Sequence, residues 1–448
     1  MTAYWLERAW TGTAPVVDGL RVEVSGGVFT SVAAGSSEGA VRLPGLTIPG
    51  LANCHSHVFH RALRGRAQRG AGSFWTWREQ MYALAARLTP DSYFELARAT
   101  YREMVSVGVT TVGEFHYLHH GPDGTPYDDP NAMSHALLAA AGEAGIRIAL
   151  LDTCYLAAGI GRGPEGVQRR FSDGTAEAWA ARRAVMDWDD TRSTGQVGDG
   201  SAAVSAGRGA AIHSVRAVPR EQLTEVVAWA DAHRAPLHVH LSEQVAENDQ
   251  CLEAYGVTPT RLLADAGALG PRTSAVHATH LTDDDVRLLA ESSSLVCLCP
   301  TTERDLGDGV PSHRLHSVVP VTVGSDSHAV VDLLEELRAV EMHERLATQE
   351  RGHWPVDDLL RAGTAEGHRS LGFGDAGCIE VGARADLVTL DTASVRTAGA
   401  GADETTAVFA ASGADVVHVL RDGVDVTVDP REVGAELDRV IRSLWEDS

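Results

Sequence analysis

The sequence predicts an α/β fold, a (β/α)8 barrel of the TIM type joined to a small β-sandwich domain that both chain ends form together. Two observations predict this arrangement. In the central part of the chain, eight short apolar runs alternate with helix-like segments, as in a parallel barrel. Both ends instead contain short strand-like runs interrupted by glycine, such as VVDGLRVEV and DVVHVLRDGVDV. We therefore expect residues 1–48 and 376–448 to form the small β domain, and residues 49–375 to form the barrel.

The eight barrel strands are expected where apolar residues form runs bounded by polar or turn-forming residues. In chain order these runs are LTIPGLANCHSH (46–57), VTTVGEFHY (109–117), RIALLDTCY (147–155), AAVSAGRGAAIHS (202–214), PLHVHLSE (236–243), TSAVHATHL (273–281), SLVCLCPTTE (294–303) and VTVGSDSH (321–328). Helices are expected between most of them, for example at Asp91–Val107, Asn131–Ala144, Arg220–His233 and Asp283–Glu291.

One central segment does not follow this alternation. From Gly159 to about Gly200 the chain is rich in Gly, Arg, Asp and Ser, and only one helix is expected there, at Thr175–Asp187. Because the segment follows the third strand, it leaves the barrel at the face where active sites lie, and long loops at that face often cover the site. A mobile surface insertion is the alternative.

Composition and charge exclude several classes of function. Hydrophobic residues make up 44% of the chain and charged residues 22%, as in ordinary globular proteins. The formal net charge of -23 disfavours binding to nucleic acid or to anionic membranes. The chain has no apolar run of about 20 residues and no signal-peptide pattern, so we expect a cytoplasmic protein. Its six cysteines are expected to be reduced, buried thiols.

The most informative polar residues lie at or just after the ends of the predicted strands. His55 and His57 form a His-x-His pair, and alternation along a strand directs both imidazoles to the same side, where they could bind one divalent metal. His240 and Glu243 lie three residues apart at the end of the fifth strand. His238 is on the same strand face as His240, but His240 is nearer the loop and is the preferred ligand.

Two further strands end in the same way. His277 ends the sixth strand, and Asp326 follows the eighth in a Gly-Ser-Asp sequence. Any one of these residues alone could be a hydrogen-bonded core histidine or a helix-capping aspartate. Their combination and order along the chain favour a metal centre at the carboxyl face of the barrel.

This combination resembles the amidohydrolase superfamily over nearly the whole chain. It is most similar to the mononuclear zinc deaminases, because no lysine occurs at the end of the fourth strand that could be carboxylated and bridge two metals. Within that group the sequence resembles the formimidoylglutamate deiminases of histidine breakdown. The stretches that carry the resemblance are NCHSHVFHRALR (53–64), GSFWTWREQMY (72–82), GEFHYLHH (113–120), IHSVRAV (212–218), LHVHLSEQ (237–244) and CLCPTTERDLGDG (297–309).

The resemblance implies a role for each matching residue. It implies one divalent metal ion, with zinc as the expected metal, bound by His55, His57, His240 and Asp326. It implies proton transfer by Glu243, His277 and Asp326, whose division of labour stays open. It also implies a dicarboxylate substrate, N-formimino-L-glutamate, bound by His60, Arg78, Tyr117, His213 and Arg216, and a homodimer. Arginine suits this substrate because its planar fork binds carboxylates. Arg304 is a weaker candidate for the same task. Trp75 and Trp77 are expected to pack the loop that presents Arg78.

The alternatives differ in substrate, reaction or class. Another aminohydrolase of the superfamily, such as a guanine, cytosine or adenosine-type deaminase, would keep the fold and the metal, but two strand-end arginines favour a dicarboxylate over a neutral base. Hydrolysis to formamide and glutamate would act on the same substrate. A barrel without catalysis, used for binding, would be expected to lack metal ligands. Iron or manganese could replace zinc, because His and Asp bind several metals.

Overall fold

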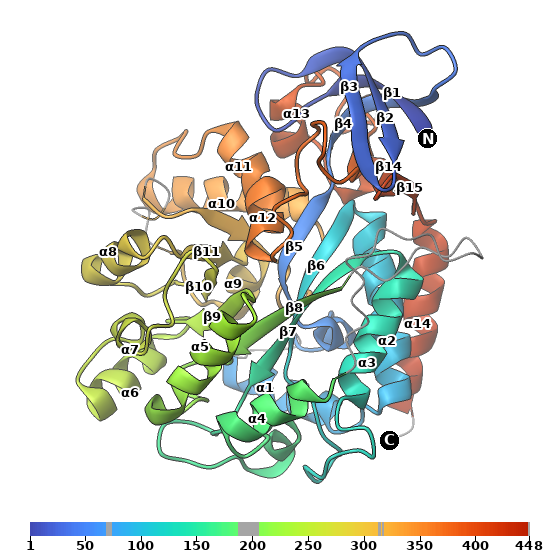
Figure 1. Cartoon of the computed structure of the whole chain (residues 1–448). Helices are drawn as coiled ribbons and strands as arrows, with labels where there is room; N and C mark the ends of the chain where they lie inside the picture. The colour runs from blue at the N-terminus through green and yellow to red at the C-terminus, as the bar shows by residue number, and fades with distance from the viewer. Residues whose placement is uncertain (69–73, 187–205, 312–314, 316–317, 447–448) are drawn as a thin grey trace.

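The computed structural model describes residues 1–68, 74–186, 206–311, 315 and 318–446, and it has the expected barrel and end sheet (Figure 1). Eight parallel strands form the barrel sheet in chain order, each paired with the next. They are β5 (Leu51–Ser56), β6 (Val109–His116), β7 (Arg147–Cys154), β8 (Ala206–Ile212), β9 (Leu237–Leu241), β10 (Thr273–His277), β11 (Leu295–Leu298) and β12 (Val321–Val323). The predicted fold class is confirmed.

Backbone contacts just beyond the ends of β5 and β12 bring the first and last strands together. Asp326 N–H donates to His55 O at 3.0 Å, and His57 N–H donates to Asp326 O at 3.2 Å. Ser56 and Asp326 form a parallel bridge. The barrel therefore closes through three residues that the sequence analysis places in the metal centre.

Helices connect the strands and cover the barrel (Figure 1). They are α1 (Phe74–Ala85), α2 (Pro90–Ser106), α3 (Ala132–Ala144), α4 (Ala176–Ala184), α5 (Leu223–Ala232), α6 (Val245–Tyr255), α7 (Pro259–Asp265), α8 (Asp283–Glu291), α9 (Pro300–Leu306), α10 (Leu333–Thr348), α11 (Val356–Gly363) and α12 (Ala365–Ser370), with short 3-10 turns η1 (Val58–Leu63), η2 (Gly166–Phe171) and η3 (Arg220–Gln222). The sequence explains where several of these helices begin. Thr89 caps α2 with Pro90 in its first turn, and Thr282 caps α8 ahead of three aspartates.

Strands from both chain ends form a second, seven-stranded sheet in the order β15-β14-β13-β4-β1-β2-β3. Its members are β1 (Thr2–Ala9), β2 (Val17–Ser25), β3 (Val28–Ala34), β4 (Val41–Pro49), β13 (Leu387–Leu390), β14 (Val416–Arg421) and β15 (Val424–Asp425), accompanied by α13 (Glu404–Phe409) and η4 (Gly413–Asp415). The run 46–57, expected as one strand, is instead two, β4 in this sheet and β5 in the barrel. Gly50 lies between the two strands. A side chain does not fit at this position, because a Cβ there would lie 2.3 Å from Thr110 Oγ1 and 2.8 Å from Asp386 Cβ.

A buried ion-pair cluster connects the barrel to the end sheet. Arg147, at the start of β7, donates to Asp386 Oδ2 at 2.5 Å and to Asp422 Oδ1 at 2.6 Å. Asp386 Oδ1 also accepts the backbone N–H of Asp422 at 2.8 Å. The Arg147 and Asp386 side chains are fully buried, so each charge depends on the other for compensation.

The described part of the 159–200 segment, which was expected to be a long loop with one helix, is packed against the barrel. It contains η2 and α4, and α4 is close to the predicted helix, whose last residue, Asp187, lies outside the described residues together with 188–200. Trp179 Nε1 donates to Asp152 Oδ1 at 2.9 Å, and Arg182 forms an ion pair with the same carboxylate at 2.8 Å. This part is therefore not a loosely attached surface insertion.

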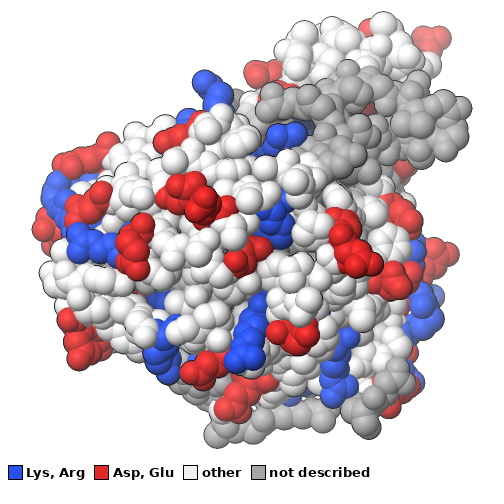
Figure 2. All heavy atoms as spheres, turned by 60° about the horizontal axis from the view of Figure 1, so that its bottom comes forward, with Lys and Arg blue, Asp and Glu red and all other residues white. Residues whose placement is uncertain are grey.

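The C-terminal helix α14 (Pro430–Glu446) runs beside α2 of the barrel (Figure 1). Val433 and Leu437 pack against Ala99, and Glu436 forms ion pairs with Arg98 and Arg102. All six cysteines are free thiols, five of them buried. No helix in the described residues is long and apolar enough to cross a membrane. On the face shown in Figure 2, acidic and basic side chains are interspersed among uncharged ones.

Candidate metal centre and active site

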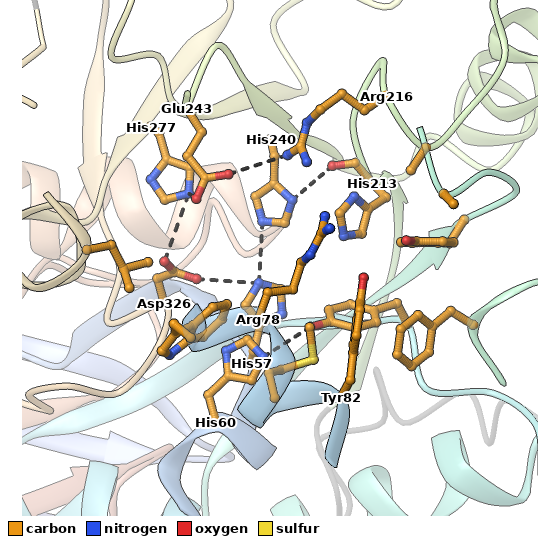
Figure 3. Close-up of a pocket in the computed structure, with 18 of the residues that line it drawn as sticks. His57, His60, Arg78, Tyr82, His213, Arg216, His240, Glu243, His277 and Asp326 are labelled. Carbon is orange, nitrogen blue, oxygen red and sulfur yellow. Dashed lines mark hydrogen bonds and ion pairs between the residues drawn. The ribbon is translucent and has the colours of Figure 1, made fainter. Parts of the chain in front are cut away.

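A pocket opens at the carboxyl ends of the barrel strands, where the active sites of such barrels lie. Histidine and carboxylate side chains occupy one part of its wall, and two arginines and several aromatic rings line the rest (Figure 3). The lining residues are His57, His60, Trp77, Arg78, Met81, Tyr82, Tyr117, Tyr155, Ala157, Ala158, Phe171, His213, Arg216, Ala217, His240, Glu243, His277, Leu306 and Asp326.

The four side chains expected to bind a metal converge on one point. His55 Nε2 lies 3.1 Å from His240 Nε2 and 3.3 Å from Asp326 Oδ1. His57 Nε2 lies 3.3 Å from His240 Nε2 and 3.4 Å from Asp326 Oδ1. Ligand atoms around a tetrahedral zinc with bonds of about 2.0–2.1 Å are about 3.3–3.4 Å apart, so these spacings fit one metal ion.

Hydrogen bonds fix the protonation of two of these rings. His57 Nδ1 donates to Phe115 O at 2.9 Å, and His240 Nδ1 donates to His213 O at 2.9 Å. In the neutral rings the Nε2 lone pairs therefore face each other, an unfavourable arrangement that a cation between them would relieve. Burial lowers the pKa of His55 to about 3 and also lowers those of His57 and His240, which keeps the rings neutral, as metal binding requires.

His277 is a further potential ligand. One ligand atom each from His55, His240, His277 and Asp326 lies within 4.8 Å of the other three. His277 Nε2 is 3.9 Å from Asp326 Oδ2 and 3.9 Å from Glu243 Oε1, farther than the spacings in the His57 set. His277 Nδ1 is 3.4 Å from Glu303 Oε1. We therefore favour His57 as the ligand, with His277 beside the metal position.

The backbone near the site is held in uncommon conformations. Asp326, His277 and Ser242 all have positive φ, at 40°, 69° and 51°, although none is glycine. Asn53 restrains the Asp326 segment, because its Nδ2 donates to Ser325 Oγ at 2.7 Å and its Oδ1 accepts from Ser325 N–H at 2.9 Å. This reciprocal pair aligns β5 with the residue that precedes Asp326.

Glu243 and His277 influence each other's protonation. Burial raises the pKa of Glu243, whereas His277 and Arg216 lower it. Burial also lowers the pKa of His277, but Glu243, Glu303 and Asp326 outweigh it and raise this pKa well above its usual value. The two side chains form a buried pair beside the metal position that can hold or pass a proton.

The five expected substrate-binding residues all line the pocket. Arg216 Nη2 lies 3.5 Å from Glu243 Oε2, and its Nε donates to Glu247 Oε2 at 3.0 Å. Arg78 lies over the ring of Tyr82, 5.6 Å from its centroid. His60 Nε2 and Tyr117 Oη are 3.0 Å apart. The His213 ring lies edge-on to Tyr155, with centroids 4.6 Å apart.

Other residues considered from the sequence do not line this pocket. His238 Nε2 points to Ser370 O at 3.2 Å. His116 is buried beside Tyr93 and His119. Arg304 is half exposed and forms an ion pair with Glu335 at 2.8 Å. Trp75 was expected to support the Arg78 segment, but its side chain lies outside the described residues.

Sequence reasoning missed several residues of the site. Trp77 was interpreted as packing alone, yet it lines the pocket edge-on to His60. Tyr82 and Tyr155 also line the pocket, and Gln168 of η2 bonds both of their hydroxyls. Tyr82 and Tyr155 fall at the ends of runs already singled out, which could have drawn attention to them. Nothing local in the sequence marks Gln168.

Comparison with known proteins shows which family and which solved structures the chain resembles. Residues 46–426 match the model of the amidohydrolase family. A formimidoylglutamate deiminase of Pseudomonas aeruginosa is 37% identical over 90% of this chain and 89% of its own length. A 5-methylthioadenosine/S-adenosylhomocysteine deaminase of Halobacterium salinarum is 30% identical over 87% of this chain and 82% of its own. The crystal structure of an amidohydrolase from Brucella melitensis superposes with a TM-score of 0.88 at 30% identity, covering 99% of this chain and 100% of that one.

Proposed function

The chain belongs to the amidohydrolase family, and we propose that it hydrolyses N-formimino-L-glutamate to N-formyl-L-glutamate and ammonia, a step of histidine breakdown. One observation carries the substrate assignment: Arg78 and Arg216 line the same pocket as the histidine–aspartate cluster. Two guanidinium groups suit two carboxylates, whereas a neutral purine or pyrimidine base offers neither of them an anionic group.

A single metal ion, which we propose to be zinc, is assigned to His55, His57, His240 and Asp326, and the donor spacings and the facing lone pairs support this set. When bound, such an ion makes water a nucleophile near neutral pH. The His57 and His240 rings are held for this task by the carbonyls of Phe115 and His213.

The remaining side chains would bind the substrate and move protons. Arg216 lies near Glu243, so it would take the carboxylate beside the formimino group, with His213 next to it. Glu243 would sit against the cationic formimino end, because its buried carboxylate faces the cluster. Arg78, Tyr117 and His60 would bind the other part of the substrate from the pocket wall.

The reaction adds one water across the formimino carbon. The C–O bond forms, and Asp326 and His277 accept or share the proton that the water loses. Glu243 then gives a proton to the terminal nitrogen as the C–N bond breaks, so that ammonia leaves and the formyl group remains on the substrate nitrogen. His277 is placed to exchange protons with both carboxylates, at 3.9 Å from each.

The test is ammonia release by zinc-loaded protein supplied with N-formimino-L-glutamate, with N-formyl-L-glutamate followed by mass spectrometry. Equal amounts of the two products are expected, with one zinc per chain by elemental analysis. Arg216→Met should lower kcat/KM on the order of a hundredfold, because a charged hydrogen-bonding group to the substrate is lost.

Other results would point elsewhere. Formamide and glutamate in place of ammonia would mean that the other C–N bond is cleaved. If the protein holds one zinc but turns over only adenosine-type nucleosides or free bases, the proposed dicarboxylate substrate is wrong.

We further propose that residues 1–48 and 376–448 act as the small domain beside the barrel, and that the enzyme is a homodimer, as the family resemblance implies. Light scattering on the purified protein gives its mass in solution, and the mass of a monomer would contradict the proposed dimer.

A further inference from the structure

Two tyrosine hydroxyls in the pocket have no role in the function proposed above. Tyr82 lies on α1 and Tyr155 follows β7, and both line the same pocket as Arg78 and Arg216. Gln168 of η2 joins them, because its Nε2 lies 2.9 Å from each hydroxyl oxygen. Gln168 is itself buried, with 6% of its surface exposed, so this bridge is part of the fold and not a chance surface contact.

The orientation of the Gln168 amide determines what the tyrosines can do. Gln168 Oε1 accepts the backbone N–H of Glu165 at 3.1 Å, which directs the NH2 group toward the tyrosines. Each hydroxyl oxygen therefore accepts one amide hydrogen. The Tyr155 side chain also shares a hydrogen bond with that of Tyr82. Of the two phenol protons, one is therefore used within the pair, and the other can be given to an acceptor in the pocket.

The surroundings specify the acceptor. Arg78 lies over the Tyr82 ring, and Tyr155 is packed edge-on between His213 and Phe171. A cation beside a hydroxyl donor forms a site for an anion with more than one oxygen, such as a carboxylate. Because Arg216 is within 3.5 Å of Glu243, at the end of the pocket where the formimino group would react, this second site suits the carboxylate farther from the reacting carbon.

We infer that Tyr82 and Tyr155, held by Gln168, form with Arg78 the subsite for the remote carboxylate of the substrate, and so select dicarboxylates. This inference rests on the proposed function. Tyr82 and Tyr155 contact the substrate directly, and Gln168 is a positioning residue. The segment after β7 thereby contributes to specificity through η2.

The inference is tested with two substrates that differ only at the remote end. N-formimino-L-norvaline has a methyl group where N-formimino-L-glutamate has its second carboxylate. Tyr82→Phe/Tyr155→Phe should lower kcat/KM for the glutamate compound about 10- to 100-fold, mainly through KM, because the hydrogen bond from the tyrosine pair to a charged group is lost. The value for the norvaline compound should stay within about twofold.

Gln168→Glu tests the positioning role with almost no change in shape. A carboxylate at this place offers only acceptors, so the phenol proton that the pair offers to the pocket would turn to it instead. Gln168→Glu should therefore raise KM for the glutamate compound but not for the norvaline compound, with kcat retained. Tyr4→Phe is the matched control, because it removes a part-buried hydroxyl that bonds Gly423 O at 3.0 Å in the end sheet.

The outcomes separate this inference from the proposed function. An equal loss of kcat/KM on both substrates, or no loss on either, would overturn the subsite. Ammonia release by the wild type would still support the proposed function. If the wild type releases no ammonia from N-formimino-L-glutamate, calorimetric titration with glutarate tests the subsite alone. Weaker glutarate binding by the double variant than by Tyr4→Phe would then support it, and equal binding would overturn it.

Discussion

Replacing Glu243 by glutamine separates proton transfer from metal binding. The side chain is 8% exposed, with Oε2 3.5 Å from Arg216 Nη2 and Oε1 3.9 Å from His277 Nε2. Glutamine keeps the shape and an oxygen that can face Arg216, and Glu247 still holds Arg216 at 3.0 Å. What is lost is the group that exchanges a proton with the substrate, which contributes about 10²- to 10⁴-fold, or roughly 3–5 kcal/mol in the barrier.

The assay is kcat for ammonia release, measured together with the zinc content of each variant. Because Glu243 lies outside the four-atom set assigned to the metal, Glu243→Gln should hold one zinc, keep KM within severalfold and lose kcat. Glu247→Gln is the matched control, because the same substitution there weakens the support of Arg216 and should raise KM with little change in kcat. A Glu243→Gln protein with wild-type kcat, or one that has lost its zinc, would refute this reasoning.

Three further predictions concern stability and the support of the metal. Arg147→Met should lower the free energy of unfolding by about 3–5 kcal/mol in urea titration, because it leaves the buried Asp386 uncompensated; a change below 1 kcal/mol would argue against this cluster. Although burial opposes ionisation, Arg147 lowers the pKa of Asp386 from 3.8 to about 2. The ionised Asp386 therefore stabilises the folded protein by roughly 2 kcal/mol above pH 4, and this contribution is lost as the pH falls through 2. The difference in unfolding free energy between the wild type and Asp386→Asn should narrow over that range, and a constant difference would contradict this prediction. Asn53→Ala should weaken zinc affinity about 10- to 100-fold in a competition with a chelator, whereas unchanged affinity would mean that the Ser325 contact does not position Asp326.

Part of the arrangement of the histidine–aspartate cluster follows from strand alternation and barrel geometry, whereas its ligand roles are implied by the family resemblance. Side chains alternate along a strand, so His55 and His57 had to face the same way, and the carboxyl ends of parallel strands meet at one end of a barrel. That is why His240, His277 and Asp326, far apart in sequence, could be placed together from the sequence. The preference for His240 over His238 rested on its closeness to the loop, and the structure has only His240 in the cluster.

The boundary between the two sheets was not visible in the sequence. Residues 46–52 are apolar apart from Thr47, and this pattern does not show which residues pair with the end sheet and which with the barrel. The division depends on Gly50, where Thr110 and Asp386 approach the backbone too closely for any side chain. Asp386 is more than 300 residues away in the chain, so this constraint exists only in the folded protein.

The pocket wall was least predictable for a related reason. The role of Gln168 depends on three contacts, to Glu165, Tyr82 and Tyr155, of which two cross between separate elements. A glutamine in a glycine-rich segment has the composition of a loop, and only packing against α1 gives it a function. The same applies to Phe171, which reaches the pocket because η2 is folded onto the barrel.

These differences indicate how chemistry and specificity are divided in this fold. His55, His57 and Asp326 are fixed by the backbone contacts that close the barrel, so their positions cannot change without opening the sheet. Arg78, Tyr82 and Gln168 lie on α1 and η2, outside the barrel strands, where substitutions cost the barrel little. A shared metal centre with different substrates is the expected result of that arrangement. Changes in specificity should therefore be sought in α1 and η2, and losses of metal in β5 and the turn after β12.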